Sequence, residues 1–255
     1  MEKVFVSWSG GKDCCLACYE AVMDGLDVRY LVSIITKGND RLWPHALSPE
    51  VMKMQAEAMG IPMIQWWTTV PEYDAEYRKM LLALKENGVT GGVFGDVSLG
   101  NSHAKRHRRW VESVCRPTGI KPYLPLWDRG REHILTELID SGFEVIIIAV
   151  DDDKLGKGYL GRKLDTELLS ELKLRHELSP TGEVGYYHTF VVDGPLFEKR
   201  LQILEADAVK YPDKIRRDGV WYLDIRKCQL ETKSSQAEPI YAGVESTSFK
   251  VECEA

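Results

Sequence analysis

Mainly apolar runs of strand length alternate with helix-like segments along the first 150 residues of the chain. The runs cover 4–8, 28–35, 62–66, 93–96 and 145–150. In the segments between them, apolar residues recur three or four positions apart or helix start and stop signals occur, as is typical of amphipathic helices. These segments predict helices over 14–24, 49–59, 73–87, 103–116 and 134–141.

This alternation predicts a doubly wound α/β fold, that is, a Rossmann-like parallel sheet with helices on both faces. Strands that are apolar at nearly every position are buried on both faces, because a strand with one solvated face alternates apolar and polar residues. We expect the strand over 145–150, the most apolar run in the chain, to complete this sheet.

The pattern changes after residue 150, where helices no longer separate the apolar runs. A glycine-rich loop over 155–162 leads into a helix from about residue 165, and strand-like segments follow over 186–192 and 220–225. We predict a main domain over 1–118, a smaller α+β lobe over 119–232 and a flexible tail over 233–255 that is rich in Ser, Glu and Ala.

Charge and cysteine content narrow the class of protein. The chain has 33 Lys and Arg against 39 Asp and Glu, a net charge of −6, which argues against broad nucleic-acid binding. No apolar run approaches the ~20 residues that cross a bilayer, and the N-terminus leads into a strand rather than a signal peptide. The six cysteines are too few and too unevenly spaced for a disulfide scaffold. We therefore predict a cytoplasmic protein with reduced thiols.

The candidate chemistry begins with Ser9-Gly10-Gly11-Lys12-Asp13, between the first predicted strand and the first predicted helix. In a doubly wound sheet this is the edge where ligands bind. Two glycines allow a tight turn that brings backbone N–H groups close to an anion, and the helix that follows adds its unpaired N–H groups. The Lys12 ammonium would contact phosphate oxygens, and the Asp13 carboxylate would hold Mg²⁺ or orient a donor.

Asp96 ends another predicted strand of the same sheet, so its carboxylate should lie at the same edge. We favour metal or nucleotide contact for Asp96 over a plain helix cap. The basic run 103–109 follows closely; most of its side chains should form a solvated helix face, while Arg109 would reach a phosphate or an acidic patch of a protein partner.

The glycine segment fits neither the Walker motif nor the dinucleotide-binding motif. It resembles the PP-loop, SGGxDS, of the ATP pyrophosphatases, which cleave ATP between the α- and β-phosphates and hold the pyrophosphate in the loop. Cys14 stands where the PP-loop has its final serine. Since a thiol is a weaker hydrogen-bond donor than a hydroxyl, one phosphate contact is expected to be weaker here.

Later segments resemble, in the same order, the blocks of the diphthine–ammonia ligase family. These blocks are His45-Ala46-Leu47, 55–62, 95–97, 109–112, 124–127, 161–165 and the stretch 182–189, which is similar to the family's GExGExxT. The resemblance spans residues 4 to about 197. It implies a sheet of the PP-loop ATPase type and an enzyme that adenylates a carboxylate, after which ammonia displaces AMP to complete diphthamide on elongation factor 2.

The resemblance also implies the roles of individual residues. The nucleotide would contact Ser9, Gly10, Gly11, Lys12, Asp13, Cys14, His45 and Asp96. Asp13 and Asp96 would position Mg²⁺, the catalytic groups would be Lys12, Asp13, Glu183 and His188, and the acceptor would contact Arg109, Arg162 and Thr189. ATP, ammonium and elongation factor 2 are the implied partners, and free ammonium is the simplest nitrogen donor because the chain has no recognisable glutaminase unit.

The acceptor stretch departs from the family pattern at two positions. Family ligases commonly have an acid where this chain has Tyr186 and His188. Such acids would attract ammonium or the trimethylammonium group of diphthine, and a histidine offers instead a proton acceptor with a pKa near neutrality. The nucleotide chemistry is therefore better supported than the identity of the acceptor.

Two other functions stay open at this stage. One is a PP-loop enzyme that acts on a different small molecule or on tRNA, which would need a tRNA-sized basic surface or a persulfide cysteine. The other is a non-catalytic nucleotide sensor built on the same sheet. The pair Cys15-x-x-Cys18 has no second Cys pair or nearby His to complete a zinc site, so we interpret it as buried packing.

Overall fold

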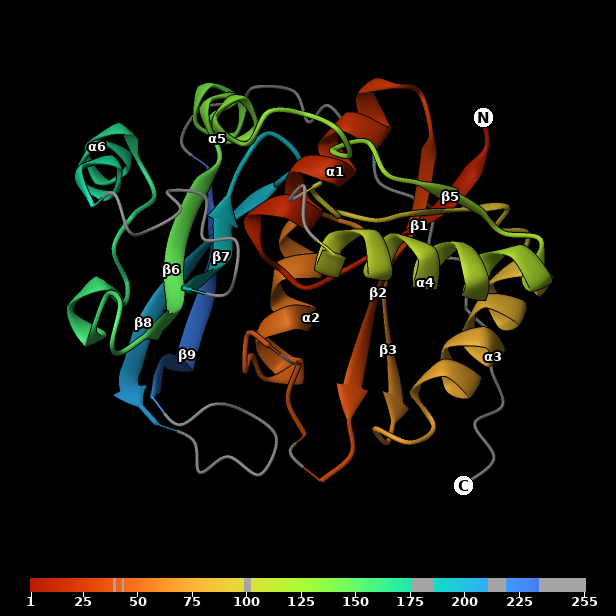
Figure 1. Ribbon diagram of the computed structural model, residues 1–255, viewed down its shortest axis with the longest axis horizontal. Coiled ribbons are helices and arrows are strands. Elements are labelled where there is room, and N and C mark those ends of the chain that lie inside the picture. Colours follow the sequence, from red (N-terminus) through yellow and green to blue (C-terminus); the bar gives the residue numbers. More distant parts are fainter. Residues whose placement is uncertain (39, 43, 99–101, 176–185, 211–218, 234–255) are drawn as a thin grey trace.

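Five parallel strands form the first of two sheets in the computed structural model (Figure 1). In order across the sheet they are β3 Met63–Thr68, β2 Asp27–Thr36, β1 Lys3–Ser7, β4 Gly91–Val93 and β5 Lys121–Tyr123. The structure describes 1–38, 40–42, 44–98, 102–175, 186–210 and 219–233, except for the side chains of 102 and 103. The predicted doubly wound parallel sheet is confirmed.

Helices cover both faces of this sheet. They are α1 Lys12–Met23, α2 Pro49–Ala58, α3 Tyr73–Glu86 and α4 Ser102–Thr118. Val4 and Val6 of β1 pack into one buried cluster with α1 and α2, whereas Phe5 packs into a second buried cluster with α3 and α4. Because successive side chains of a strand point to opposite faces, this division explains why β1 is apolar throughout.

The second sheet is antiparallel and contains the most apolar strand of the chain. Its order is β7 Tyr187–Asp193, β6 Glu144–Asp151, β9 Val220–Thr232 and β8 Lys199–Val209, and it is accompanied by α5 Arg131–Asp140, a short 3₁₀ turn Lys157–Tyr159 and α6 Thr166–Leu174. The prediction that the strand over 145–150 completes the parallel sheet was wrong. Burial on both faces makes a strand apolar, but it does not encode the direction of the neighbouring strands, and β6 is a central strand of this other sheet.

Two strands gave no clear signal in the sequence. β5 lies just beyond the predicted domain boundary at 118 yet belongs to the parallel sheet, as a three-residue edge strand that contains Pro122. Proline is tolerated at such an edge, and so short a segment shows no periodicity. β8 has a single buried residue, Leu201, and pairs with β9 along its length. The predicted tail lies outside the described residues except for Lys233, whose ammonium pairs with Asp193 at 2.5 Å.

The two sheets share one continuous core. The larger buried cluster contains residues of α1 and α2 together with residues of β6 and β7, and the two sheets stand on either side of these helices (Figure 1). The Glu198 N–H donates to the Ala58 carbonyl at 2.7 Å, and the Val191 N–H of β7 donates to the Gly10 carbonyl at 2.9 Å. The second sheet is therefore held against the loop that follows β1. Within the described ranges, none of the helices combines the length and apolar character that a membrane crossing needs.

Candidate active site

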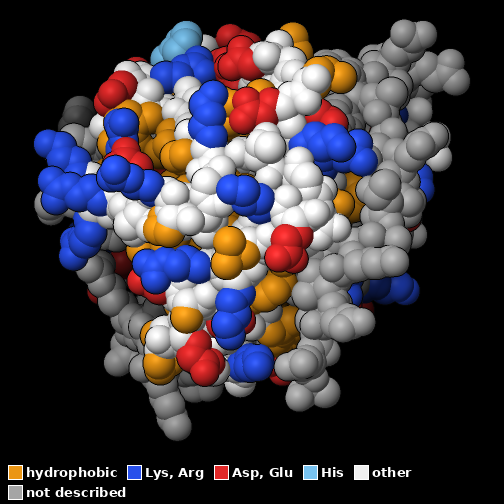
Figure 2. All heavy atoms as spheres, turned by 90° about the vertical axis from the view of Figure 1, so that its right-hand side faces the viewer, with side chains coloured by type: hydrophobic (Ala, Val, Ile, Leu, Met, Phe, Trp, Pro, Cys, Tyr) orange, Lys and Arg blue, Asp and Glu red, His pale blue; other side chains and the backbone are white. Residues whose placement is uncertain are grey.

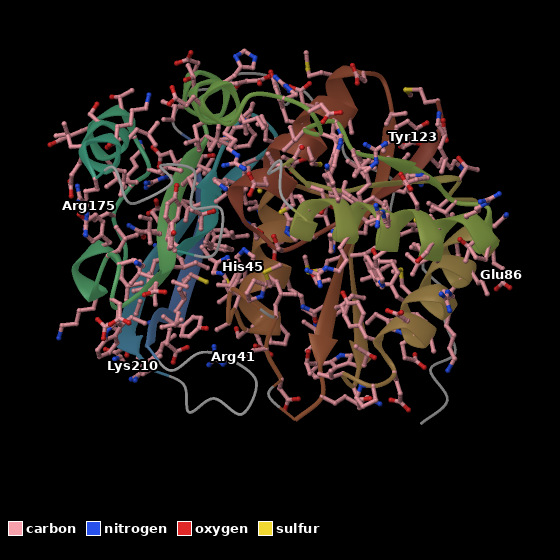
Figure 3. The ribbon with its side chains drawn as sticks, in the orientation of Figure 1. Arg41, His45, Glu86, Tyr123, Arg175 and Lys210 are labelled. Atoms are coloured by element: carbon pink, nitrogen blue, oxygen red, sulfur yellow. The ribbon has the colours of Figure 1, made fainter. Side chains whose placement is uncertain are left out.

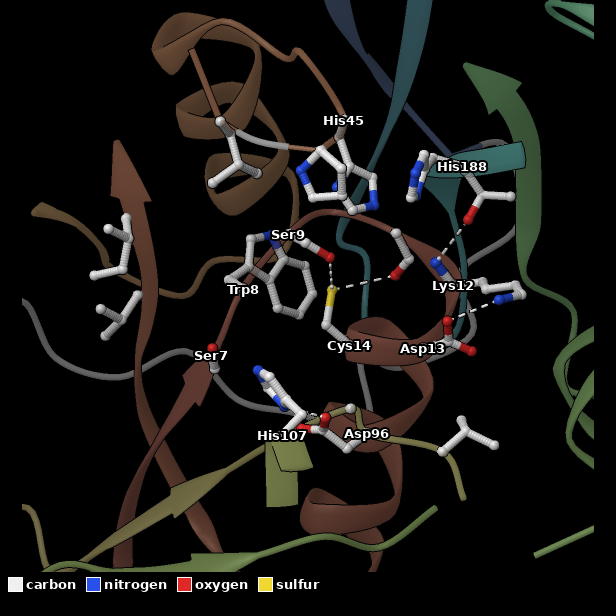
Figure 4. A pocket seen from close by; sticks show the side chains of 18 of the residues that line it. Ser7, Trp8, Ser9, Lys12, Asp13, Cys14, His45, Asp96, His107 and His188 are labelled. Carbon is white, nitrogen blue, oxygen red and sulfur yellow. Dashed lines mark hydrogen bonds and ion pairs between the residues drawn. The ribbon is translucent and has the colours of Figure 1, made fainter. Parts of the chain in front are cut away.

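A cavity of about 570 Å³ opens where the strand order of the parallel sheet reverses, between β1 and β4. At such a switch point the loops after neighbouring strands diverge and leave a crevice at their carboxyl ends. The described residues lining it are Ser7, Trp8, Ser9, Gly11, Lys12, Asp13, Cys14, Val32, Ile34, Thr36, Leu42, Pro44, His45, Tyr73, Gly95, Asp96, Val97, Ala104, His107, Tyr187, His188 and Thr189. Most of the predicted nucleotide-contacting residues thus meet in one place (Figure 4).

The loop after β1 depends on its two glycines for different reasons. Gly10 has a φ of +76°, a conformation that L side chains rarely adopt, and a Cβ there would lie 2.8 Å from Gln55 Oε1. Gly11 is the N-cap of α1, and a Cβ there would lie 3.0 Å from His45 Nε2. A side chain at Gly10 would therefore be strained, and one at Gly11 would require His45 or Thr189 to shift by a few tenths of an ångström.

Gln55 of α2 fixes this loop from beneath. Its amide group donates to the carbonyls of Gly10 at 3.0 Å and Val191 at 2.7 Å, and it accepts from the Trp8 indole at 2.9 Å. Gln55 is fully buried, so each of these bonds replaces a contact with water that the folded chain cannot make. In the sequence Gln55 stands out only as part of a family block; its signal for this role is a glutamine on the otherwise apolar face of a predicted helix.

The start of α1 presents positive charge to the cavity. The Lys12 side chain is largely buried, with the residue 8% exposed, and its ammonium lies 2.7 Å from Asp13 Oδ2. The Lys12 N–H donates to Thr189 Oγ1 of β7 at 3.1 Å, so Thr189 caps the helix from the other sheet. A nearly buried ammonium is costly unless it is paired, and here Asp13 is its partner.

Cys14 turns its thiol toward the loop rather than away from it. The thiol donates to the Gly11 carbonyl at 3.2 Å and accepts from the Ser9 hydroxyl at 3.5 Å (Figure 4). Burial opposes ionisation of the Cys14 thiol, but hydrogen bonds with Cys15 and Ser9 outweigh burial and hold the pKa of Cys14 below its ordinary value. Burial raises the pKa of the neighbouring Cys15 thiol well above its ordinary value. The pair of cysteines is therefore asymmetric, and only Cys14 lines the cavity.

The loop after β4 brings Asp96 to the same cavity, three residues beyond the end of the strand. A Cβ on Gly95 would lie 2.7 Å from the backbone of Asp13 and Cys14, so this loop packs directly on the first turn of α1. Asp96 Oδ1 lies 2.5 Å from His107 Nδ1 of α4, and this hydrogen bond, opposed by burial, raises the pKa of His107 above its ordinary value. Sequence reasoning placed Asp96 correctly at the edge but did not single out His107 from the basic run.

Two histidines from separate elements lie next to each other on one side of the cavity. His45 comes from the connection between β2 and α2, and His188 comes from β7; their ring centroids are 4.9 Å apart. Figure 3 shows His45 near the middle of the molecule, between the two sheets, and Figure 4 shows both rings on the side of the cavity away from Asp96. The Lys12 ammonium thus lines the cavity at the start of α1. The imidazoles of His45 and His188 line one side, and the Asp96 carboxylate lines the opposite side.

Comparison with known proteins identifies the chain. Residues 2–122 match the diphthamide synthase N-terminal domain, and residues 130–229 match the diphthamide synthase C-terminal domain. The chain belongs to the diphthamide synthase family.

The similar curated proteins are named diphthine–ammonia ligase. The human one is 28% identical over 91% of this chain and 94% of its own length, and the Danio rerio one is 30% identical over 89% and 95%. The Schizosaccharomyces pombe one is 27% identical over 89% of this chain, which spans only 39% of that protein. A solved structure described as a predicted subunit of tRNA methyltransferase from Methanocaldococcus jannaschii aligns with a TM-score of 0.44 at 16% identity, over 76% of this chain and 98% of that chain.

Some residues expected to act in a diphthamide synthase lie elsewhere or outside the described part. Arg109 is exposed on α4 and does not line the cavity. Arg162 forms two hydrogen bonds to the Glu171 carboxylate, at 3.0 and 2.6 Å, and also lies away from the cavity lining. Glu183 lies outside the described residues, and Tyr186 is half-buried against the core. The structure brings Thr189 and His188, but neither arginine, to the phosphate loop.

The two acids of the cavity would fit a magnesium ion only together with a nucleotide. In the part of the chain that the structure describes, no cluster of three or more His, Cys, Asp or Glu side chains could hold a metal by itself. Asp13 and Asp96 both line the cavity and belong to two loops in direct contact. Mg²⁺ typically takes one or two carboxylates together with substrate phosphates, which is the donor set that Asp13, Asp96 and a bound triphosphate would supply.

Proposed function

We propose that this chain is an ATP-dependent ligase that adenylates the carboxylate of diphthine on elongation factor 2 and replaces AMP with ammonia. The observation that carries the proposal is a glycine loop at the switch point, with a buried lysine at its end, in a chain of the diphthamide synthase family. Its family relatives bear the name of this activity. The human and Danio rerio proteins are covered almost end to end.

The nucleotide is bound by two different surfaces of the cavity. The loop N–H groups at the start of α1 and the Lys12 ammonium bind the β- and γ-phosphates. Val32 and Ile34 of β2, with Leu42, offer an apolar wall for the base. This arrangement leaves the α-phosphate exposed toward the rest of the cavity. A carboxylate oxygen of the acceptor attacks the α-phosphorus, the bond to the β-phosphate oxygen breaks, and pyrophosphate stays in the loop.

Asp13 and Asp96 are the residues that would hold Mg²⁺ beside the phosphates. When bound there, the ion supplies positive charge that stabilises the pyrophosphate leaving group. Each of these acids is already paired with a basic side chain, Lys12 for Asp13 and His107 for Asp96. A bound ion would displace these bases or share the acids with them.

The second half-reaction requires a proton acceptor. Ammonia attacks the acyl carbon of the adenylate, the C–O bond to AMP breaks, and the nitrogen loses a proton. We assign the acceptance of this proton to His188, which lines the cavity where family ligases commonly carry an acid, and we retain Glu183 as a second catalytic residue. Thr189 orients this segment through its contact with the Lys12 N–H.

The two arginines are proposed to act at the protein surface instead of on the reacting groups. Arg109 is exposed on α4 and would contact the protein substrate, whereas Arg162 would support the second lobe by pairing with Glu171. Five described cysteines are free, which fits a reducing compartment such as the cytoplasm.

A tRNA acceptor is less well supported than a protein acceptor. On the face shown in Figure 2, basic and acidic side chains are interspersed and do not form one basic block. A general phosphate grip needs a continuous basic surface. This chain has Tyr186 and His188 where family ligases commonly have acids. The replacement favours one second candidate, a ligase of the same mechanism that acts on a different carboxylate.

The test is a reconstituted reaction. Purified protein is incubated with ATP, Mg²⁺, ¹⁵N-ammonium and elongation factor 2 that carries diphthine, and AMP, pyrophosphate and labelled amide are measured. We expect all three products only when both acceptor and ammonium are present. Tight ATP binding without turnover on any carboxylate would indicate a nucleotide sensor. Turnover on a different carboxylate but not on diphthine would identify that carboxylate as the acceptor. Deletion of the protein from its host should leave elongation factor 2 without the terminal amide.

A further inference from the structure

A second cavity of about 420 Å³ adjoins the first beside α3 and α4. It is lined by Tyr73, Arg106, His107 and Trp110. Tyr73 and His107 also line the nucleotide cavity, so the two cavities share a wall. None of the nucleotide chemistry described above uses Tyr73, Arg106 or Trp110. This second cavity therefore has an aromatic and cationic lining without an assigned ligand.

The aromatic part of this lining is held in place by its neighbours. The Trp110 indole N–H donates to Asp74 Oδ1 at 2.8 Å, and its ring lies 4.9 Å from the ring of Tyr77 and 5.2 Å from that of His107, measured between centroids. The Tyr73 ring lies 5.7 Å from that of Trp110, and Tyr73 is 38% exposed. A fixed indole and an accessible phenol thus meet at the surface, with the Asp74 carboxylate beside them.

The chemistry of this lining suits a ligand with a quaternary ammonium group and a carboxylate. Aromatic faces attract cations that cannot donate hydrogen bonds, and the Asp74 carboxylate adds negative charge next to the indole. The Arg106 guanidinium matches a carboxylate in charge and geometry. Diphthine carries both groups on one carbon, since its trimethylammonium is attached next to the carboxylate that is amidated.

We propose that Tyr73, Trp110 and Arg106 form the subsite for the trimethylammonium–carboxylate end of the acceptor, an inference that rests on the proposed function. The rings of Tyr73 and Trp110 receive the trimethylammonium group, and the carboxylate on the same carbon, attracted by Arg106, lies at the wall that this cavity shares with the nucleotide cavity. In this chain Tyr186 and His188 replace the acids that would otherwise attract that cation. The subsite makes the enzyme specific for a fully methylated acceptor.

A nucleobase is the rival occupant, because aromatic rings and a guanidinium also stack on bases. The nucleotide cavity already has an apolar wall from β2 next to the phosphate loop. The base therefore has a place without the second cavity, and the experiment separates the two occupants through the KM values of ATP and acceptor.

The experiment measures steady-state kinetics with two forms of elongation factor 2, one carrying diphthine and one carrying the same side chain without its three N-methyl groups. We expect Tyr73→Ala to raise the KM for the diphthine form about tenfold, to leave the KM for ATP unchanged, and to weaken the preference for the methylated form. Tyr73→Phe keeps the ring and should stay within about twofold of the unaltered protein. Arg106→Ala should raise the acceptor KM, whereas Arg108→Ala is the matched control, since Arg108 pairs with Glu112 and is not part of the lining.

A second readout does not depend on turnover. Trimethylglycine, which has the same two charged groups, should change tryptophan fluorescence in a saturable way, and Trp110→Phe and Tyr73→Ala should each abolish this change. If the unaltered protein binds trimethylglycine but forms no AMP with elongation factor 2, the subsite stands and the proposed acceptor falls. An unchanged acceptor KM in Tyr73→Ala, a raised KM for ATP, or no trimethylglycine signal in the unaltered protein would each overturn the subsite.

Discussion

Two walls of the nucleotide cavity, one from β1 and α1 and one from β7, differ in what determines their shape. They are the backbone wall and the side-chain wall. The wall from β1 and α1 follows a backbone path that depends on Gly10 and Gly11, where a Cβ would crowd Gln55 and His45. The wall from β7 is made of side chains, Tyr187, His188 and Thr189, that approach from the other sheet. The first wall keeps the PP-loop pattern nearly intact, while the second departs from its family at Tyr186 and His188. We infer that binding of phosphates tolerates little change and that recognition of the acceptor is where this chain has diverged.

The largest effect is expected when the backbone wall is filled. Gly10→Ala combines a strained positive φ with a Cβ 2.8 Å from Gln55 Oε1, so it should abolish detectable ATP binding and lower the thermal midpoint. Gly25→Ala is the matched control: Gly25 has a φ of +80° but nothing within 4 Å of a Cβ. It should cost about 1 kcal/mol of unfolding free energy and leave ATP binding intact. Calorimetry measures the unfolding free energy, and titration measures ATP binding. Equal losses of ATP binding in the two variants would show that backbone strain, not crowding of the loop, is the cause.

Removal of the buried charge comes next. Lys12→Met should lower kcat for adenylation about 10²- to 10³-fold, because the charge developing on the pyrophosphate loses a preorganised partner. Lys79→Met removes an exposed lysine that pairs with Glu76 and should leave the rate unchanged. Pyrophosphate exchange into ATP reports the adenylation step. A fall in both variants would point to the overall charge of the protein instead of the position of Lys12.

The side-chain wall should affect only the second half-reaction. His188→Ala is expected to lower the ammonia-dependent formation of amide about 10²-fold, the usual worth of a positioned base. Pyrophosphate exchange should continue, because the phosphate loop is untouched. If exchange falls as far as amide formation, His188 supports the nucleotide and the proposed division between the two walls is wrong.

A smaller change is expected where the backbone wall departs from its family. Cys14→Ser replaces a cavity-lining thiol with a hydroxyl, a stronger hydrogen-bond donor to a phosphate oxygen, and we expect the KM for ATP to fall about two- to fivefold. Cys228→Ser, on β9 and away from the cavity lining, is the control. A raised KM in Cys14→Ser would mean that the loop of this chain has adapted to sulfur.

The smallest effect concerns Arg162 and Glu171, which lie outside both walls. Hydrogen bonds from Arg162 and Tyr159 lower the pKa of Glu171 from 4.5 to about 2. A carboxyl with a lowered pKa stabilises the fold above its unfolded pKa and loses this contribution as the pH falls through the folded pKa. Both side chains are partly exposed, at 36% and 40%, so the contribution should be less than about 1 kcal/mol.

Urea denaturation of Glu171→Gln tests this sign. The variant should have a lower free energy of unfolding than the unaltered protein, by an amount that is constant between about pH 7 and 5. This difference should shrink as the pH falls from 4.5 and disappear near pH 2. Arg162→Ala should behave like Glu171→Gln and leave both KM values unchanged. A raised acceptor KM in Arg162→Ala alone would show that Arg162 contributes to substrate binding, as the family resemblance implied.

Much of the phosphate loop and its position was predictable from local patterns. A short apolar strand, two glycines and an amphipathic helix place Ser9 to Asp13 at the ligand edge of a parallel sheet, and the end of another strand places Asp96 beside them. These inferences depend on neighbours in sequence, for which hydrophobic periodicity and turn chemistry are direct physical evidence. The same patterns gave the four helices around the parallel sheet.

The partners from distant parts of the chain were decided only by the tertiary structure. Thr189 accepts from the Lys12 N–H across 177 residues, and the Gln55 amide donates to the Val191 carbonyl across 136. The assignment of β6 to the antiparallel sheet is of the same kind, because an apolar run states that a strand is buried but not which strands flank it. The sequence by itself therefore determined where phosphates can bind, through backbone sterics and helix geometry. The packing of the second sheet against α1 and α2 decided which side chains face those phosphates, since burial of a shared apolar core fixes the contacts between segments that no local rule relates.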